Sequence, residues 1–176
     1  MSSRLQRPGS QANSRSPYSE AMTDIVDRKT RSRMMSGIRG RDTKPEITVR
    51  SLLHRSGFRF RLHVRELPGK PDIVLPRYRA IVNVMGCFWH GHECATFRWP
   101  STRKAFWRGK ILENRRRDHA VGALLLRANW RTATVWECAL RGRTARSEAK
   151  LARTLSSWIR SRSSHLVVES TSNLES

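Results

Sequence analysis

Hydrophobic and polar residues alternate without a break over residues 58–64 (FRFRLHV) and again over residues 130–136 (WRTATVW). Successive side chains of a β-strand point to opposite faces, so each segment predicts a strand with one buried face. Residues 72–75 predict a further strand, and the apolar residues 80–85 predict a more deeply buried one. Residues 76–78 (PRY) join these two strands as a hairpin connection.

Helices are predicted on either side of these strands. Thr43 can cap a helix, Glu46 can reach back to that cap, and Pro45 is tolerated in the first turn. This helix is expected to run to Gly57. Three further helical segments are predicted over residues 30–39, 102–128 and 147–160. A helix, a strand meander, and then a helix followed by a strand predict an α/β domain with a mixed β-sheet flanked by helices.

The two ends of the chain differ in composition from the segment between them. Residues 1–21 are rich in Ser, Arg, Pro and Gln and lack periodicity, so we expect a disordered leader. Residues 161–176 are rich in Ser and predict a flexible tail, which leaves residues 22–160 as the folded domain. No apolar run approaches the roughly 20 residues that span a bilayer, and the basic N-terminus has no apolar stretch behind it. The sequence therefore predicts neither a membrane span nor a secretory signal.

Basic residues outnumber acidic ones by a wide margin. The 176 residues include 35 Lys and Arg against 14 Asp and Glu, for a formal net charge of +21. Residues 22–143 hold 27 basic and 10 acidic residues, so most of the excess lies on the folded body. With six Trp and five Phe, the chain is too apolar to be an unfolded polycation. A preference for Arg over Lys would not create this excess over acids, so we expect a nucleic acid as the partner.

Three cysteines cannot all pair as disulfides, so a metal site or free thiols must be considered. Cys87, His92 and Cys94 lie close together in the sequence, and Cys138 follows the strand predicted at 130–136. Three thiolates and one imidazole are a common tetrahedral set for structural Zn²⁺. His90 has the same reach as His92 and is the competing imidazole. The alternative is that the cysteines are small buried residues and the histidines face solvent.

Asp72 opens a predicted strand beside the strand at 80–85. Many nucleases hold Mg²⁺ with an acidic residue in such a place. One carboxylate, a backbone carbonyl and the phosphate suffice, because Mg²⁺ takes oxygen ligands and keeps several waters. A second acid and a Lys are usual on the next strand, but Asn83 and Met85 take those positions here. The alternative is that Asp72 only begins the strand.

Two other carboxylates and one histidine are candidates for the same centre. Glu46 is more simply a helix-capping residue, and Asp118 on the long predicted helix would by default form a surface ion pair. If His92 binds the zinc, His90 is free to act as a general acid or base near neutral pH.

Large aromatic residues occur where burial is difficult. Phe88 and Trp89 lie in a short polar loop, and Trp107 lies near a helix start among basic residues. Apolar side chains beside Arg and Lys are typical of proteins that separate base pairs, so these three residues are candidates for contact with DNA. The alternative is ordinary packing in the core.

Several of these features belong to segments that follow one another in a fixed order. They are RSRMM at 31–35, RDT at 41–43, LPGKPD at 67–72, GCFWHGHEC at 86–94, TR at 102–103 with FW at 106–107, and VWECALRG at 135–142. Together they resemble the very-short-patch repair (Vsr-type) DNA mismatch endonucleases. The resemblance covers residues 22–160, and its GCFWH block is highly specific to that family.

The resemblance implies a restriction-endonuclease-like fold with a structural zinc. It also implies an activity that nicks the T-bearing strand of a T:G mismatch left by deamination of 5-methylcytosine. By motif, Asp72 and the backbone carbonyl of Val84 match the positions that hold Mg²⁺, and His90 matches the catalytic histidine. Glu46 and Asp118 match supporting polar positions in the active site. The matching zinc ligands are Cys87, His92, Cys94 and Cys138, and the matching aromatic wedge is Phe88, Trp89 and Trp107.

The resemblance further implies a monomer in the bacterial cytoplasm, associated with the nucleoid. Its partner would be double-stranded DNA containing a T:G mismatch, with mismatch-repair proteins as further candidates.

One departure concerns the strand before the GCFWH block. The best-known member of the family has a Thr-His pair where this chain has Val84 and Met85. Val84 can still offer its carbonyl, but Met85 cannot transfer a proton, so we expect slower activity or altered specificity. Two alternatives stay open. One is a catalytically weak, zinc-stabilised mismatch or DNA-binding protein, and the other is a related nuclease with a different DNA target.

Overall fold

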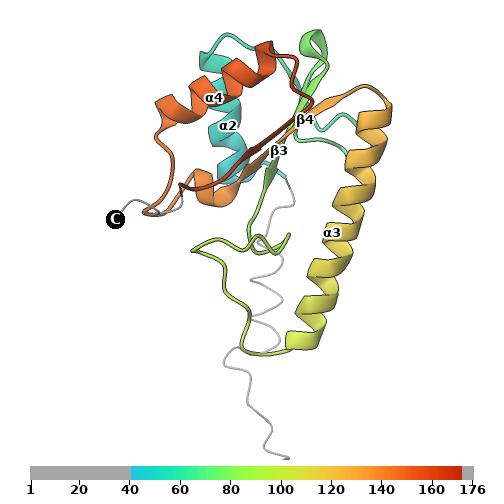
Figure 1. Ribbon diagram of the computed structural model, residues 1–176, viewed down its shortest axis with the longest axis vertical. Helices are drawn as coiled ribbons and strands as arrows, with labels where there is room; N and C mark the ends of the chain where they lie inside the picture. The colour runs from blue at the N-terminus through green and yellow to red at the C-terminus, as the bar shows by residue number, and fades with distance from the viewer. Residues whose placement is uncertain (1–40, 172–176) are drawn as a thin grey trace, which may run out of the picture. The chain divides into compact units, whose positions relative to one another are not determined.

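A five-stranded mixed β-sheet with helices on both faces forms the centre of the computed structural model, which describes residues 41–171 (Figure 1). The elements in chain order are α2 (Lys44–Arg55), β1 (Arg61–Leu62), β2 (Ile73–Leu75), a 3₁₀ turn (Pro76–Tyr78), β3 (Ala80–Met85), α3 (Lys104–Arg127), β4 (Arg131–Trp136), a 3₁₀ turn (Glu137–Ala139), α4 (Glu148–Arg160) and β5 (His165–Val168).

The strands lie side by side in their chain order, from β1 to β5. The pairs β1–β2 and β2–β3 are antiparallel, whereas β3–β4 and β4–β5 are parallel. Met85 is the register partner of Trp136, so β3 and β4 end at the same edge of the sheet. The loop from residue 86 and the 3₁₀ turn from residue 137 both begin at this edge, which brings the GCFWH block and Cys138 close together.

The two faces of the sheet are covered differently. Helices α2 and α4 pack on one face, where Leu53 and Leu155 join a core with Val82 and Val135. Helix α3 lies on the opposite side (Figure 1), where Leu125 packs in a smaller core with Val74, Ile81 and Trp130. Only part of this second face is covered, and the uncovered part forms the cleft described below.

Helix α2 begins as its sequence predicts. The Thr43 side chain accepts a hydrogen bond from the Glu46 amide at 3.4 Å and donates one to the Glu46 carboxylate at 2.9 Å. The same carboxylate accepts from the Asp42 amide at 3.0 Å. Gly57, where the predicted helix was to end, has a φ of +84° that a residue with a Cβ rarely adopts.

The segments predicted as strands 72–75, 80–85 and 130–136 and as helices 102–128 and 147–160 form those elements, with boundaries that shift by at most two residues. The α/β class with a mixed, helix-flanked sheet is confirmed. The helix predicted at 30–39 and the leader at 1–21 lie outside the described residues.

Two predictions need correction. The strand expected over residues 58–64 is reduced to Arg61–Leu62, because His63 turns into the left-handed region at φ +48° and ends the extended run. The tail expected from residue 161 was wrong for residues 165–168, which form β5 and pair with β4. Val168 is buried and Leu166 packs against the core, but a four-residue strand beside Ser-rich segments is too short to show its pattern. The fold therefore extends at least to residue 168.

Along residues 41–171, each helix is too short or too polar to cross a membrane.

Candidate active site and metal centre

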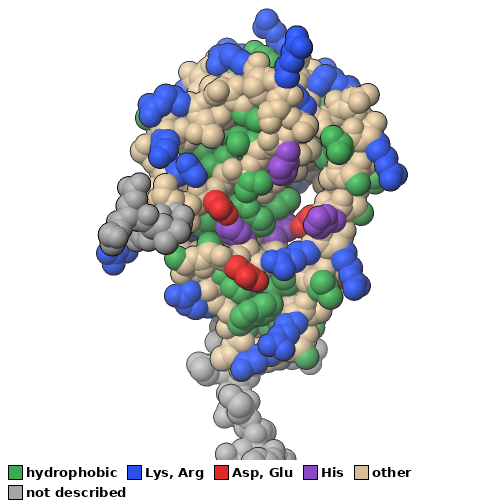
Figure 2. Space-filling view, viewed as in Figure 1, with side chains coloured by type: hydrophobic (Ala, Val, Ile, Leu, Met, Phe, Trp, Pro, Cys, Tyr) green, Lys and Arg blue, Asp and Glu red, His purple; other side chains and the backbone are tan. Residues whose placement is uncertain are grey.

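An open cleft of about 1440 Å³ lies beside the uncovered part of the sheet, between the strands and α3. Figure 2 shows acidic and histidine side chains gathered in a hollow, with Lys and Arg side chains around it. The cleft is lined by all four residues predicted to be catalytic, which are Glu46, Asp72, His90 and Asp118. The fold thus brings together residues from the start of α2, the start of β2, the loop after β3 and the middle of α3.

Asp72 lies immediately before β2, next to the backbone of β3. Its Oδ2 accepts a hydrogen bond from the Val84 amide at 2.8 Å. Burial raises the pKa of this carboxyl, and the nearby Glu46 carboxylate raises it further, although the bond from Val84 acts in the opposite direction. Asp72 and the Val84 backbone are therefore neighbours in the cleft, as a shared metal ion would require.

His90 is oriented by a carboxylate from another element. Its Nδ1 lies 2.5 Å from Oδ2 of Asp118 on α3. An ionised carboxylate only accepts hydrogen bonds, so Nδ1 carries the proton and Nε2 is left as the basic nitrogen of the ring. This arrangement makes His90 suitable as a general base whose orientation is fixed by Asp118.

Helix α3 also holds the backbone of the loop that carries His90. Asn114 donates to the Trp89 carbonyl at 2.8 Å, and Arg115 donates to the carbonyls of His90 at 3.0 Å and Gly91 at 2.5 Å. Gly91 has φ +61°, and a Cβ there would lie 2.6 Å from a methyl group of Ile111. Sequence reasoning missed Asn114 and Arg115. Their spacing before Asp118 on one helix was the available signal, but nothing local indicates that they contact the loop.

Glu46 belongs to a network of charges at the start of α2. It is only 5% exposed and accepts from Arg50 at 2.7 Å, while the other nitrogen of that guanidinium bonds Asp42 at 2.5 Å. Nε2 of His63 lies 3.4 Å from the same Asp42 carboxylate. The donor atoms of Asp42, Glu46 and His63 are close enough to hold a metal ion, but Arg50 already supplies the positive charge between them. Like Asn114 and Arg115, the residues Arg50 and His63 were not predicted from the sequence pattern.

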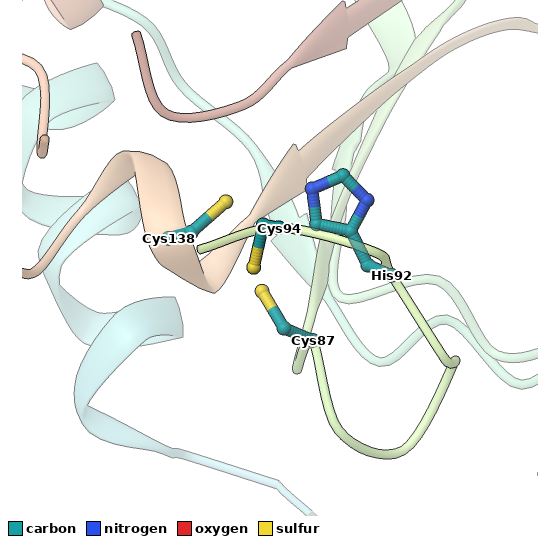
Figure 3. Close-up of side chains that lie close together, drawn as sticks. All are labelled: Cys87, His92, Cys94 and Cys138. Carbon is teal, nitrogen blue, oxygen red and sulfur yellow. The ribbon is translucent and has the colours of Figure 1, made fainter. Parts of the chain in front are cut away.

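Four side chains that could hold a metal ion lie in the His90 loop and beside it. Figure 3 shows the three sulfur atoms and the histidine ring turned toward one another, and their donor atoms all lie within 4.8 Å. The members are Cys87, His92, Cys94 and Cys138. Three come from the loop after β3 and one comes from the turn after β4. His92 rather than His90 joins this group, since His90 is paired with Asp118.

The donors of this group fit a divalent cation. Nε2 of His92 is buried and makes no hydrogen bond within the described part of the chain, although Glu169 lies 3.4 Å away. Burial raises the pKa of Cys87 to about 12, so its thiol would stay protonated unless a cation stabilised the thiolate. Three sulfurs and one imidazole suit Zn²⁺. Trp136 stacks on the His92 ring at 4.2 Å, with the ring planes 8° apart, and so fixes its orientation.

The three aromatic residues predicted to form a wedge contact one another. Phe88 packs edge-to-face on Trp89 and on Trp107, with ring centres 5.2 and 5.1 Å apart, and the two tryptophans are 6.0 Å apart. All three are half-buried. They form one cluster between the His90 loop and the first turn of α3.

Comparisons with known proteins show which family this chain belongs to. A family model described as DNA mismatch endonuclease Vsr matches residues 23–96. The DNA mismatch endonuclease Vsr of Escherichia coli K12 is 44% identical over 138 residues, which are 78% of this chain and 88% of that protein. The chain belongs to the Vsr family. The type II nicking enzyme V.XorIIP of Xanthomonas oryzae pv. oryzae is 48% identical over 119 residues, which are 68% of this chain and 88% of that protein.

Membership in the Vsr family makes this protein an endonuclease. The mixed sheet with flanking helices fits the restriction-endonuclease-like fold of the family, so this prediction is confirmed together with the family itself. Met85 lines the cleft beside Val84 and Asn83, at the place where the sequence departs from the Thr-His pair.

Proposed function

We propose that this Vsr-family protein is a Mg²⁺-dependent endonuclease that nicks the T-bearing strand of a T:G mismatch, the product of 5-methylcytosine deamination. One observation carries the proposal. The pair formed by His90 and Asp118 lines the same cleft as Asp72 and the Val84 backbone, so a general base and a candidate metal site face one substrate space. Relatives named as a mismatch endonuclease and as nicking enzymes support the choice of DNA as substrate.

Asp72 and the carbonyl of Val84 would hold the Mg²⁺, which would supply positive charge to the scissile phosphate and the leaving oxygen. The Val84 amide holds the Asp72 carboxylate in place through its hydrogen bond. Nε2 of His90 would accept the proton of the attacking water while Asp118 holds the ring and stabilises the imidazolium. Glu46 supports the site from the wall of the cleft, with its charge balanced by Arg50.

The group of Cys87, His92, Cys94 and Cys138 would hold a structural Zn²⁺. Two of these residues flank His90 in the sequence, so the metal would fix both ends of the short loop that presents it. The same ion would tie this loop to the turn after β4. The zinc thus contributes to catalysis only by positioning the loop.

Recognition of the mismatch is assigned to the cluster of Phe88, Trp89 and Trp107. Aromatic side chains inserted between base pairs unstack and kink a duplex, and a mismatched pair resists this least. Lys and Arg side chains around the cleft would bind phosphates without choosing the sequence. We further propose a monomer that works on nucleoid DNA in the bacterial cytoplasm, with mismatch-repair proteins as partners.

A second candidate function is a DNA-binding protein that recognises mismatches but cuts them weakly. Met85 favours it, because a methionine in the wall of the cleft cannot take the place of a second imidazole. It predicts binding that prefers a mismatch, with no strand break under any divalent metal ion.

The test of the proposed function compares the parent protein with Asp72→Ala on a T:G duplex. With Mg²⁺ the parent should nick, whereas EDTA or the substitution should abolish the nick. A parent that nicks equally in EDTA, or an Asp72→Ala variant that nicks as fast as the parent, would contradict the metal site. Tight mismatch binding by a parent that never nicks would favour the second candidate.

A further inference from the structure

Two large aromatic side chains outside the wedge cluster are exposed. Trp99 is 48% exposed and Phe106 is 49% exposed. Neither lines the active-site cleft. Trp99 is supported from one side by Phe97, with ring centres 5.1 Å apart, and Phe106 is supported by Trp107 at 5.2 Å. Both rings are thus held in place by neighbours while a large part of each stays open to solvent.

Each exposed ring has an arginine beside it. The guanidinium carbon of Arg108 lies 5.9 Å from the ring centre of Trp99, and that of Arg103 lies 4.3 Å from the ring centre of Phe106. Residues 95–112 contain five basic residues and no acidic one. Within residues 41–171, neither Arg103 nor Arg108 has a carboxylate within 4.0 Å. Each of the two pairs, Trp99 with Arg108 and Phe106 with Arg103, therefore combines flat apolar area with positive charge that the described part of the chain does not neutralise.

We propose that these two pairs, Trp99 with Arg108 and Arg103 with Phe106, together serve as a flank surface, a second DNA-binding area that contacts the duplex beside the mismatch. This inference rests on the proposed function, because it takes the mismatched duplex as the substrate. Phe106 contacts Trp107 of the wedge cluster, so the Arg103–Phe106 pair adjoins the place where the duplex would be opened. The guanidinium groups would bind phosphates, and the rings would pack on the sugars or exposed base edges between them.

The charge of residues 95–112 favours DNA over a protein as the partner of the flank surface. The rim of a protein–protein interface is polar, whereas this stretch of eighteen residues carries five positive charges and no negative one. A polyanion that also offers apolar rings and sugars matches both features of the surface. The flank surface is therefore assigned to the DNA duplex on one side of the mismatch.

The test uses two T:G duplexes in an anisotropy titration, a short one that covers only the wedge and the cleft and one that is extended on both sides. The parent should bind the extended duplex about tenfold more tightly, and the variant Trp99→Ala/Phe106→Ala should lose most of that gain. Arg103→Gln/Arg108→Gln should lower the slope of log K against log salt by about two.

Leu124→Ala is the matched control, because Leu124 is 48% exposed on α3 and should leave both affinities unchanged. A Trp99→Ala/Phe106→Ala variant that keeps the full gain on the extended duplex would overturn the flank surface, and would leave these rings available to a protein partner. The result is independent of cleavage. A parent that never nicks contradicts the proposed function, whereas the length dependence of binding reports on the flank surface alone.

Discussion

Nδ1 of His90 and Oδ2 of Asp118 lie 2.5 Å apart, although the two residues are 28 positions apart in the sequence. The histidine comes from the loop after β3 and the aspartate from the middle of α3, and Arg115 on the same helix binds the backbone of that loop. Helix α3 therefore fixes both the position of His90 and the tautomer of its ring. This relationship separates His90 from His92, which lies among the candidate metal ligands instead.

Asp118→Asn should lower the single-turnover nicking rate about 100-fold, because a neutral amide no longer stabilises the imidazolium that forms on His90. Affinity for the duplex should stay within about twofold of the parent's, since the Asp118 carboxylate is engaged by His90 and its substitution by Asn keeps the size of the side chain. Quenched-flow or gel-based nicking gives the rate, and anisotropy gives the affinity. Glu113→Gln is the control on the same helix, because Glu113 is exposed and, within residues 41–171, forms its ion pair with Lys110. A variant with the parental rate would remove Asp118 from the mechanism.

Asp72→Asn should abolish nicking but stabilise the protein without Mg²⁺ at neutral pH. Burial raises the pKa of Asp72, so the folded protein holds a proton there more tightly than the unfolded chain does. The native state is therefore favoured at low pH, and this stabilisation is lost as the pH rises through the raised pKa. At pH 7.5 the melting temperature of the variant should be about 2–4 °C higher than that of the parent. This difference should disappear toward pH 4. A lower melting temperature at pH 7.5 would show that the ionised carboxylate stabilises the fold.

The purified protein should contain about one zinc per chain. Cys138→Ser should lose the metal and melt at a much lower temperature, because the site joins the loop of residues 87–94 to the turn after β4. Mass spectrometry of the metal content and circular dichroism check these two outcomes. His165→Ala, at an exposed histidine outside the group, should keep the zinc. Full zinc content and a parental melting temperature in Cys138→Ser would exclude this residue as a ligand.

Arg50→Met should destabilise the fold by about 3–5 kcal/mol, because it leaves the buried Glu46 carboxylate without its cation. Arg55→Met is the matched control one turn later, since Arg55 pairs with Glu148 at the surface and should cost less than about 1 kcal/mol. Urea unfolding measures both free energies. Equal costs for the two variants would mean that the Arg50 network adds no more than a surface ion pair.

Local patterns were sufficient for most of the fold. The Thr43–Glu46 cap, the buried strand at 80–85 and the alternation at 130–136 are each encoded by residues near one another in the sequence. The short strand β5 escaped prediction because its pairing with β4, rather than its own pattern, makes it a strand. His63 likewise ends β1 through a backbone conformation that its sequence context does not indicate.

The site could be predicted only in part, because local patterns do not show contacts between segments that are distant in the sequence. Motifs identified Asp72, His90 and the four candidate metal ligands, because these segments are distinctive in themselves. The pattern missed Asn114 and Arg115, because they contact a loop that is distant in the sequence. It also missed Arg50, because the Glu46 carboxylate that Arg50 binds becomes buried only in the folded protein. No spacing rule connects Asn114 to the carbonyl of Trp89.

The central claim is strand-specific nicking at a T:G mismatch. A duplex with one T:G pair and a different fluorophore on each strand, incubated with the protein and Mg²⁺ and resolved on a denaturing gel, tests it most directly. The T-bearing strand alone should be cut, and a matched duplex of the same sequence should stay intact. Cleavage of the G-bearing strand, of both strands, or of the matched duplex at the same rate would contradict it.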